Sequence, residues 1–367
     1  MKEAGDIAAL SVPFTLGVGA GTFITEHLNL MQEHIAAGAA MMLCILLLAL
    51  FVHQRGGRWL PPVIFLFLGI FCSISHNLCS GMLAVRSISG IRSLPGRCVR
   101  MLRDLIASVP FRHDSTNALV SALLTGDRSG LSAEQTASFR DSGASHILAL
   151  SGLHLGFIYL MVSRMLSIAG NGTITRRARS VVIIAFAGFY TLMTGAGPSI
   201  VRAFIFIVLN EFSSLSPERK RTPARTLMTA LTVQLAFDPS VISSLGFQLS
   251  YLAMTGIMFL YPTMSAWYPD DARINVFNPM KKLWDSTVMT VSCQIFTAPL
   301  VWIHFRTFPK YFIITNLTAV PLTSAIMSVS VMTICLHGLG ICPEALVRTD
   351  DFLVQAMLYI LGCISGM

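Results

Sequence analysis

Long apolar stretches alternate with short polar ones along most of the chain. A helix needs roughly 20 apolar residues to cross the hydrocarbon core of a bilayer, and windows of this length predict about eleven membrane spans. The pattern is therefore typical of an all-α polytopic membrane protein. The predicted spans lie at 7–26, 34–53, 59–80, 145–169, 179–197, 198–215, 223–238, 240–261, 285–305, 311–336 and 350–366, of which the seventh and the last are short.

One long polar stretch, residues 81–144, interrupts this alternation. Its first part, up to residue 113, carries six arginines and a single acid, Asp104. Apolar residues recur at helical spacing from Val99 to Val109, with arginines on the other face, which predicts an amphipathic helix lying on the membrane surface. The six arginines are Arg86, Arg92, Arg97, Arg100, Arg103 and Arg112.

The second part of the polar stretch predicts a re-entrant or interfacial hairpin. The apolar run 117–124 is too short to cross a bilayer, and the segment 126–130, which includes Asp127 and Arg128, is a predicted turn. Ser132 then caps a short helix, with Gln135 at the capping-box position. Irregular backbone at membrane depth is tolerated only where it is buried in protein or lines an aqueous cavity. The hairpin is therefore the best indication of a pathway through the membrane.

Composition excludes an ordinary soluble protein. Hydrophobic residues make up 54% of the 367 positions and charged residues 12%, and the mean hydropathy is +0.68. Soluble domains carry roughly 25% charged residues, because they need a polar surface. The lipid bilayer is therefore the expected environment.

The net charge of +8 divides into two parts. Most of the excess lies in loops that are cytoplasmic if the N-terminus is cytoplasmic, as the positive-inside rule predicts. The rest lies in the predicted amphipathic helix, on the outer side. Two interpretations of that helix stay open: its arginines contact anionic lipid headgroups, or they form a basic collar that gathers a polyanion. The cytoplasmic loop charges are Arg55, Arg58, Arg176, Arg177, Arg179, Arg219, Lys220, Arg221, Lys281 and Lys282.

The chain contains none of the common motifs for bound metals or nucleotides. It has no Cys-x-x-Cys pair, no His-Glu-x-x-His and no Gly-x-x-x-x-Gly-Lys-Ser/Thr. Gly17, Gly19 and Gly21 lie in an apolar helix with no strand before them, so they predict close helix packing rather than a dinucleotide loop. No cofactor or metal is therefore expected.

Three polar residues in the predicted span 145–169 suggest possible chemistry: His146, Ser151 and His154. Ser151 and His154 are three residues apart and share a helix face, as the nucleophile and base of an intramembrane hydrolase would need to. Against this, no oxyanion loop is evident, and one helical turn does not normally align a hydroxyl with an imidazole. The alternative is that these small and polar side chains hold helices together.

Other polar positions lie within or beside later spans. Arg202 follows a Gly-Pro turn at Pro198, and such a charge either faces a cavity or partner or snorkels to the interface. Gln248 can bond across helices, and Asn316 and Pro321 place an amide and a kink in a later span. A scattered polar lining of this kind fits a conduit better than a single reaction site.

Four sequence blocks, in order, resemble the ComEC family of competence proteins. LLTGDRSGLS…FRDSGASHILALSGLHLG is similar to the family's Gly-Asp-Arg turn followed by His-Leu-Leu-Ala-Ile-Ser-Gly-Leu-His-Val, and TLMTGAGPSIVRAF to its Thr-Gly-x-x-Pro-Ser-x-x-Arg-Ala block. AFDPSVISSLGFQLSYLAMTGI and FPKYFIITNLTAVPLTS resemble its Gly-Phe-Gln-Leu-Ser and Asn-x-x-x-x-Pro blocks. The resemblance implies a bacterial inner-membrane channel that admits single-stranded DNA to the cytoplasm during natural transformation. It assigns to the membrane core Asp127, Arg128, His146, Ser151, His154, Pro198, Arg202, Gln248 and Asn316.

The resemblance also implies a division of the chain and a set of partners. We expect N-terminal spans at 1–80, a basic amphipathic linker at 81–113, a competence-type membrane domain at 114–340 and a C-terminal span at 341–367. Family members usually also carry an OB-fold and a metallo-β-lactamase-like nuclease, for which these residues have no counterpart. We therefore expect a channel core that is not an enzyme, served by separately encoded OB-fold or nuclease proteins and by a cytoplasmic ATPase. The alternatives are an intramembrane hydrolase and a transporter of another anionic polymer.

Overall fold

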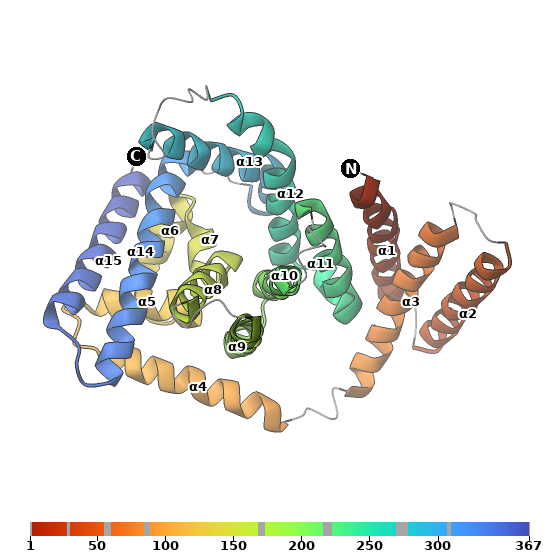
Figure 1. Cartoon of the computed structure of the whole chain (residues 1–367), viewed down its shortest axis with the longest axis horizontal. Helices are drawn as coiled ribbons and strands as arrows, with labels where there is room; N and C mark the ends of the chain where they lie inside the picture. The colour runs from red at the N-terminus through yellow and green to blue at the C-terminus, as the bar shows by residue number, and fades with distance from the viewer. Residues whose placement is uncertain are drawn as a thin grey trace. The chain divides into compact units, whose positions relative to one another are not determined.

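The chain folds as a series of α-helices. The computed structural model describes residues 2–27, 30–54, 60–83, 89–167, 173–215, 222–268, 278–306 and 310–366, and these residues contain no β-strand. The predicted all-α architecture is confirmed for them (Figure 1). The helices are α1 (Lys2–His27), α2 (Leu30–Gln54), α3 (Leu60–Leu83), α4 (Ser89–Ser108), α5 (Asp114–Thr125), α6 (Ala133–Asp141), α7 (Ser145–Leu148), α8 (Gly152–Ser167), α9 (Thr173–Met193), α10 (Pro198–Leu215), α11 (Pro223–Phe237), the 3₁₀ helix η1 (Pro239–Ser243), α12 (Leu245–Ser265), α13 (Pro279–Phe305), α14 (Phe312–Gly338) and α15 (Glu344–Ser365).

Several of these helices are long and apolar enough to cross a membrane. Within the described ranges, five meet both criteria: Ile7–His27, Leu60–Leu78, Pro198–Leu215, Pro279–Phe305 and Phe312–Gly338. They correspond to the predicted spans 7–26, 59–80, 198–215, 285–305 and 311–336. The chain is therefore a membrane protein, since helices of this length and hydropathy satisfy their own backbone in lipid.

The structure corrects several predicted boundaries, including the starts of the spans 179–197 and 285–305, whose helices begin at Thr173 and Pro279. The span 145–169 is not one helix, because α7 ends at Leu148 and α8 begins at Gly152. The span 240–261 begins later, at Leu245, because the Asp238 carboxylate accepts from the Ser240 N–H and starts the 3₁₀ helix η1. The span 350–366 begins earlier, at Glu344, directly after Pro343.

The helices form two compact units, which are described separately. Unit 1 comprises Met1–Gly90, Asn171–Ile184 and Val201–Tyr251, and unit 2 comprises Ile91–Gly170, Ala185–Ile200 and Leu252–Met367. The units interleave along the chain, and the predicted four-part division stays a prediction.

Unit 1 is organised by the close packing of α1 against α3, which lie side by side (Figure 1). A Cβ atom on Gly17 would overlap the backbone carbonyl of Leu66, and one on Gly21 would lie 2.7 Å from the Cβ of Ser73. Glycine on the opposite helix, Gly69, is equally confined by the backbone of α1. The glycine-rich stretch of α1 therefore serves helix packing, as predicted.

Unit 2 is organised by the pair α14 and α15, which pack along each other with α5 and α6 beside α15 (Figure 1). The Ser330 hydroxyl donates to Asp350 at 2.8 Å across this pair, and the Thr116 hydroxyl of α5 donates to Asp351 at 2.6 Å. Both aspartates are buried, with 0% and 5% of their surface exposed. Polar contacts thus join α15 to α14 and to α5.

The predicted amphipathic helix is confirmed as α4. Its Val99 and Ile106 are buried, as is Val109 directly after its end, while Arg97 and Arg100 are exposed. Leu105 also reaches α14, where a Cβ on Gly338 would be 3.6 Å from it. α4 therefore packs on unit 2 through its apolar face.

Candidate functional site

The first set of predicted site residues lies in a row of short helices, α5 to α8, in unit 2. These helices have 12, 9, 4 and 16 residues. Every helix end leaves backbone N–H and C=O groups without helical partners, so a row of short helices has many such groups. The polar side chains of this region are described below by the backbone groups that they bind.

The turn between α5 and α6 forms as predicted. α5 ends at Gly126, whose φ of 79° lies in the left-handed region that favours glycine. A Cβ atom at this position would also overlap the Leu150 side chain, so the turn contacts the break between α7 and α8. The predicted capping box is confirmed: the Gln135 N–H donates to the Ser132 hydroxyl at 3.1 Å, and the Ser132 N–H donates to the Gln135 side chain at 3.0 Å.

Two side chains bind carbonyl groups at the helix ends of this region. The Arg128 Nε–H donates to the carbonyl of Leu148, the last residue of α7, at 3.0 Å. The Tyr190 hydroxyl of α9 donates to the carbonyl of Leu124, in the last turn of α5, at 2.9 Å. Both carbonyls have no partner within their own helix. Arg128 and Tyr190 therefore stabilise the breaks between helices.

Asp127 links the turn to α4. The Ser129 N–H donates to its carboxylate at 3.1 Å, and the Arg103 guanidinium lies 3.0 Å from the other oxygen. Hydrogen bonds from Ser129, side chain first, lower the pKa of the Asp127 carboxyl below its usual range, and the positive charge of Arg103 adds to this. Asp127 is therefore ionised at neutral pH and binds the predicted basic helix.

Ser151 and His154 meet at the start of α8. The Ser151 hydroxyl lies 3.1 Å from His154 Nδ1, the Ser151 N–H donates to the same nitrogen at 3.2 Å, and the Leu153 N–H donates to the Ser151 hydroxyl at 3.2 Å. Ser151 thus acts as an N-cap, since its hydroxyl accepts from the second residue of α8, and His154 occupies the third position, where a capping box has Glu or Gln. The expectation that one helical turn would keep the hydroxyl and the imidazole apart is wrong, because Ser151 precedes α8 instead of lying within it.

The capping geometry fixes the state of the imidazole. Because Nδ1 accepts an N–H, the proton of the neutral ring sits on Nε2. His154 is fully buried, and its Nε2 has no hydrogen-bond partner among the described residues. No described carboxylate therefore orients the ring as the third member of a catalytic triad would. His146, on α7, is exposed and binds the Gly143 carbonyl at 3.2 Å through Nδ1.

Three further predicted residues lie at helix ends or inside helices of unit 2. Pro198 is the first residue of α10 and follows Gly195 and Ala196, whose φ values are 86° and 51°. Asn316, in the second turn of α14, has a buried side-chain oxygen without a partner in the described parts of the chain. Its neighbour Thr315 donates to the Ser142 carbonyl at 2.8 Å, which holds this turn against the end of α6. Pro321, inside α14, is exposed.

Arg202 and Gln248 lie in unit 1, so they are described separately from the residues of unit 2. The Arg202 guanidinium donates to the Ser250 carbonyl and stands 5.7 Å from the centre of the Tyr251 ring. The Tyr251 hydroxyl donates to Gln234 at 3.0 Å. Arg202 thus binds partners inside the protein. Gln248 donates to the Ile242 carbonyl of η1 at 2.8 Å, which makes its bond local.

The predicted basic face of α4 is described only in part. Arg97 and Arg100 are exposed as predicted, but Arg103 turns toward Asp127 and is engaged in the ion pair. The side chain of Arg92, like Arg86 and the loop charges at 55, 58 and 219–221, lies outside the described residues. Among the arginines of α4 whose side chains the structure describes, Arg97 and Arg100 are therefore the exposed ones outside this ion pair.

Two features of the site were missed in the sequence. Tyr190 looked like one more aromatic residue in an apolar span, although a buried hydroxyl normally requires a partner. Asp350 and Asp351 were placed at the edge of a predicted span, without a role. In the structure Asp351 joins α15 to the region before α5, because the His113 imidazole lies 2.8 Å from its carboxylate. Two adjacent acids beside an apolar helix were the available signal. Among the described residues, no group of three or more His, Cys, Asp or Glu is placed to hold a metal ion.

Comparison with known proteins places this helical region in a described family. A family model described as "Competence protein" matches residues 123–367. The match begins in α5 and therefore includes the turn, both helix breaks and all later helices.

Individual relatives are similar over shorter stretches. ComE operon protein 3 of Bacillus subtilis (strain 168) is 28% identical over 209 residues, which are 57% of this chain and 25% of that protein. The uncharacterized protein YcaI of Escherichia coli (strain K12) is 28% identical over 160 residues, 42% of this chain and 20% of that protein. An uncharacterized protein of Aquifex aeolicus (strain VF5) is 28% identical over 151 residues, 41% of this chain and 34% of that protein. The chain thus matches between 20% and 34% of the length of these relatives, and no solved structure matches it.

Proposed function

This chain belongs to the competence protein family, and on that premise we propose that it forms the membrane path by which single-stranded DNA enters the cytoplasm during natural transformation. The observation that carries the proposal is the family match over residues 123–367, which contains the broken helices α5 to α8. DNA as the substrate, the channel and the direction of transport are parts of the proposal.

The broken helices support a path in this part of the protein. Helix ends at membrane depth occur where the backbone is buried in protein or borders a water-filled cavity. Ala149, between α7 and α8, is exposed, while the groups around it are held by Arg128 and by Ser151 with His154. We propose that a DNA strand passes beside this break.

The basic helix α4 supports a way to gather the strand. Arg97 and Arg100 are exposed, and the Arg103–Asp127 ion pair joins the same helix to the turn before the break. Phosphates attracted to these arginines would therefore be concentrated next to the path. Replacing Arg97 and Arg100 with Gln should weaken DNA binding at low salt, and unchanged binding would assign these arginines to lipid headgroups instead.

We place the protein in the cytoplasmic membrane of a bacterium, with a cytoplasmic N-terminus and about eleven spans. The alternation of basic and acidic loops in the sequence supports this orientation. Cysteines introduced at the 26–33 loop and at the 176–179 segment would test it. A membrane-impermeant thiol reagent should label the first from outside and the second only after lysis.

A deletion experiment tests the function. Removing the gene should reduce transformation and the entry of labelled DNA into the cytoplasm to background, and the wild-type gene should restore both. Wild-type uptake in the deletion strain would contradict the proposal. Adding an excess of another polyanion at several salt concentrations separates DNA transport from transport of another anionic polymer, which would then compete on equal terms.

We propose no hydrolytic role for Ser151, although its 3.1 Å contact with His154 is the observation that favours one. The imidazole nitrogen that would act as base already accepts the Ser151 N–H. Ser151→Ala should therefore retain DNA uptake, with a moderate loss of stability. Complete loss of uptake in a folded Ser151→Ala protein, with uptake retained in other cap variants, would support the hydrolase.

A further inference from the structure

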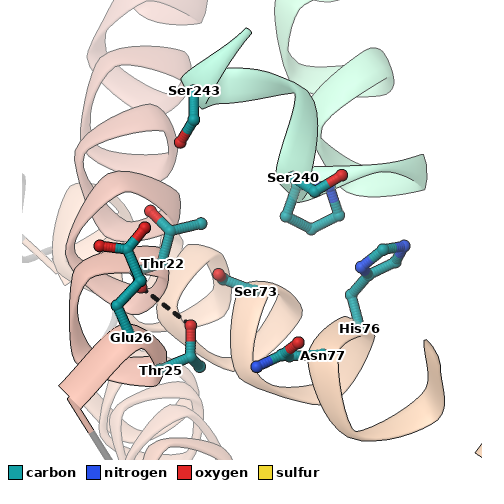
Figure 2. A pocket seen from close by; sticks show the side chains of 9 residues that line it. Thr22, Thr25, Glu26, Ser73, His76, Asn77, Ser240 and Ser243 are labelled. Atoms are coloured by element: carbon teal, nitrogen blue, oxygen red, sulfur yellow. Dashed lines mark hydrogen bonds between the residues drawn. The ribbon is translucent and has the colours of Figure 1, made fainter. Parts of the chain in front are cut away.

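A polar cavity of about 330 Å³ lies in unit 1, outside the helices used in the proposal above. It is formed by the C-terminal parts of α1 and α3 and by the corner around η1 (Figure 2). In the predicted topology, these three corners lie on the same side of the membrane, because α1, α3 and α11 all run outward. The cavity therefore opens at a membrane surface.

The hydroxyl groups of this cavity offer acceptors. The Thr22 hydroxyl donates to the Gly19 carbonyl at 2.8 Å, the Thr25 hydroxyl donates to the Thr22 carbonyl at 2.8 Å, and the Ser240 hydroxyl donates to Asp238 at 2.5 Å. A hydroxyl has one proton and two lone pairs. Because their protons are engaged, these groups present lone pairs to a ligand.

The charge around the cavity is negative. The Glu26 carboxylate lines it (Figure 2), and Asp238 and Glu33 stand behind the lining, bound to Ser240 and to Asn77 respectively. His76, which lies 3.7 Å from Asp238, is the lining residue that can become cationic, and the described lining includes no Lys or Arg. This is a local acidic site in a chain whose net charge is +8.

The C-terminal ends of two helices also favour a cation in this cavity. α1 ends at His27 and α11 ends at Phe237, so both direct C-terminal carbonyls, which carry partial negative charge, toward this region. An acid is unfavourable at such an end, yet Glu26 lies in the last turn of α1 and Asp238 is the C-cap of α11. A bound cation would relieve both repulsions.

An independent observation also indicates a ligand. Ser73 is only 3% exposed, and its hydroxyl makes no hydrogen bond to any other described residue. Figure 2 shows this side chain pointing into the cavity. Buried hydroxyls normally have a partner, and the cavity is the space from which one can come.

We propose that this cavity binds a multivalent cation whose surface consists of hydrogen-bond donors. A hydrated divalent metal ion and a polyamine share this chemistry, and both fit lone pairs and carboxylates arranged around a space of this size. The same features repel phosphate, so the site is distinct from the proposed DNA path and does not depend on it.

Thermal unfolding of the full chain tests the site. The protein is placed in nanodiscs of zwitterionic lipid and titrated with MgCl₂ or with spermidine, while NaCl keeps the ionic strength constant. At least one cation should raise the Tm in a saturable manner, since a ligand that binds the folded state stabilises it. A response to MgCl₂ alone identifies a hydrated metal ion, and a response to spermidine alone identifies a polyamine.

Variants decide whether the response comes from this cavity. The double variant Glu26→Gln, Asp238→Asn should raise the half-saturating concentration at least about tenfold, because two nearby charges are removed. Ser73→Ala, which leaves the charge unchanged, should raise the half-saturating concentration less. This variant tests the cavity if the double variant does not fold. Glu344→Gln, an exposed change on α15, should respond like the wild type. The proposal is overturned if neither cation raises the Tm, or if the cavity variants titrate like the wild type.

Discussion

The helix pair α1–α3 and the break between α7 and α8 differ in how their polar backbone groups obtain hydrogen-bond partners. In α1 and α3 the backbone of each helix is satisfied internally, and glycines such as Gly17 and Gly69 allow the two backbones to touch. At the break, the helix ends leave backbone groups without helical partners, and Arg128 binds the Leu148 carbonyl while His154 binds the Ser151 N–H. Polar side chains therefore gather where helices are interrupted, and small ones where helices are continuous.

This difference changes how polar residues of the membrane core are interpreted. Ser151 and His154 suggest catalysis when the segment is taken as one apolar helix. At a helix start, the same pair is a cap. In the proposed function, these caps stabilise the interruption between α7 and α8 beside which the DNA strand passes.

Adding a methyl group where α1 and α3 touch should destabilise the protein more than the other changes described here. Gly17→Ala places a methyl group against the Leu66 carbonyl, which is backbone and cannot move aside. We expect a loss of about 3 kcal/mol in the free energy of unfolding, measured by thermal or denaturant unfolding in detergent. Gly38→Ala, on α2, has no atom within 4 Å of the new Cβ and is the control. It should be neutral or slightly stabilising, and equal effects of the two changes would contradict the packing account.

Removing one hydroxyl at the broken helices should have an intermediate effect. Tyr190→Phe keeps the ring but leaves the Leu124 carbonyl buried without its donor, so we expect a loss of about 1–2 kcal/mol. Tyr359→Phe is the matched control, because Tyr359 is 74% exposed. A Tyr190→Phe protein as stable as the wild type would show that the end of α5 does not need this bond.

Substitutions at the N-cap of α8 should change the free energy of unfolding as they do at other helix N-caps. Ser151→Ala should cost about 1 kcal/mol, whereas Ser151→Thr should be tolerated. His154→Gln keeps an acceptor for the Ser151 N–H and should be more stable than His154→Leu. If Gln and Leu at position 154 are equally destabilising, the imidazole has a role other than capping.

The ion pair of the turn should have the smallest effect, because both partners are partly exposed. The pKa of Asp127 is lowered in the folded protein, so its contribution is present above the ordinary pKa of the carboxyl and is lost as the pH falls through the lowered value. We expect less than about 1 kcal/mol, measured as unfolding against pH from neutral to acidic. Asp127→Asn should remove this component, and an unchanged acid profile in the variant would exclude Asp127 as its source.

Much of the architecture could be predicted from the sequence because membrane helices depend on local composition. The start of α10 and the capping box at Ser132 follow from Pro198 and from the Ser-x-x-Gln spacing, respectively. The break at 149–151 could not be predicted in this way, since Ala149 and Leu150 are apolar and one serine, Ser151, also fits a continuous span. It depends on Arg128, twenty residues before the carbonyl that it binds.

The site could be predicted in part for a related reason. Asp127 and Arg128 were found because polar residues at a turn are visible in the sequence. Their partners were not, because the Leu148 carbonyl and the Arg103 guanidinium are brought to them only by the folded chain. Tyr190 was missed because its role lies in one hydroxyl bond across α9 and α5.

One cross-linking measurement tests the central claim, that the DNA strand passes beside the break. A photoreactive residue is placed at position 149, which is exposed between α7 and α8, or at Leu16 of α1, which is 63% exposed. Labelled DNA carrying a bulky block at its trailing end is then stalled during uptake in competent cells. The account predicts cross-linked DNA at position 149 and none at position 16. DNA cross-linked at position 16 but absent at position 149 would contradict it.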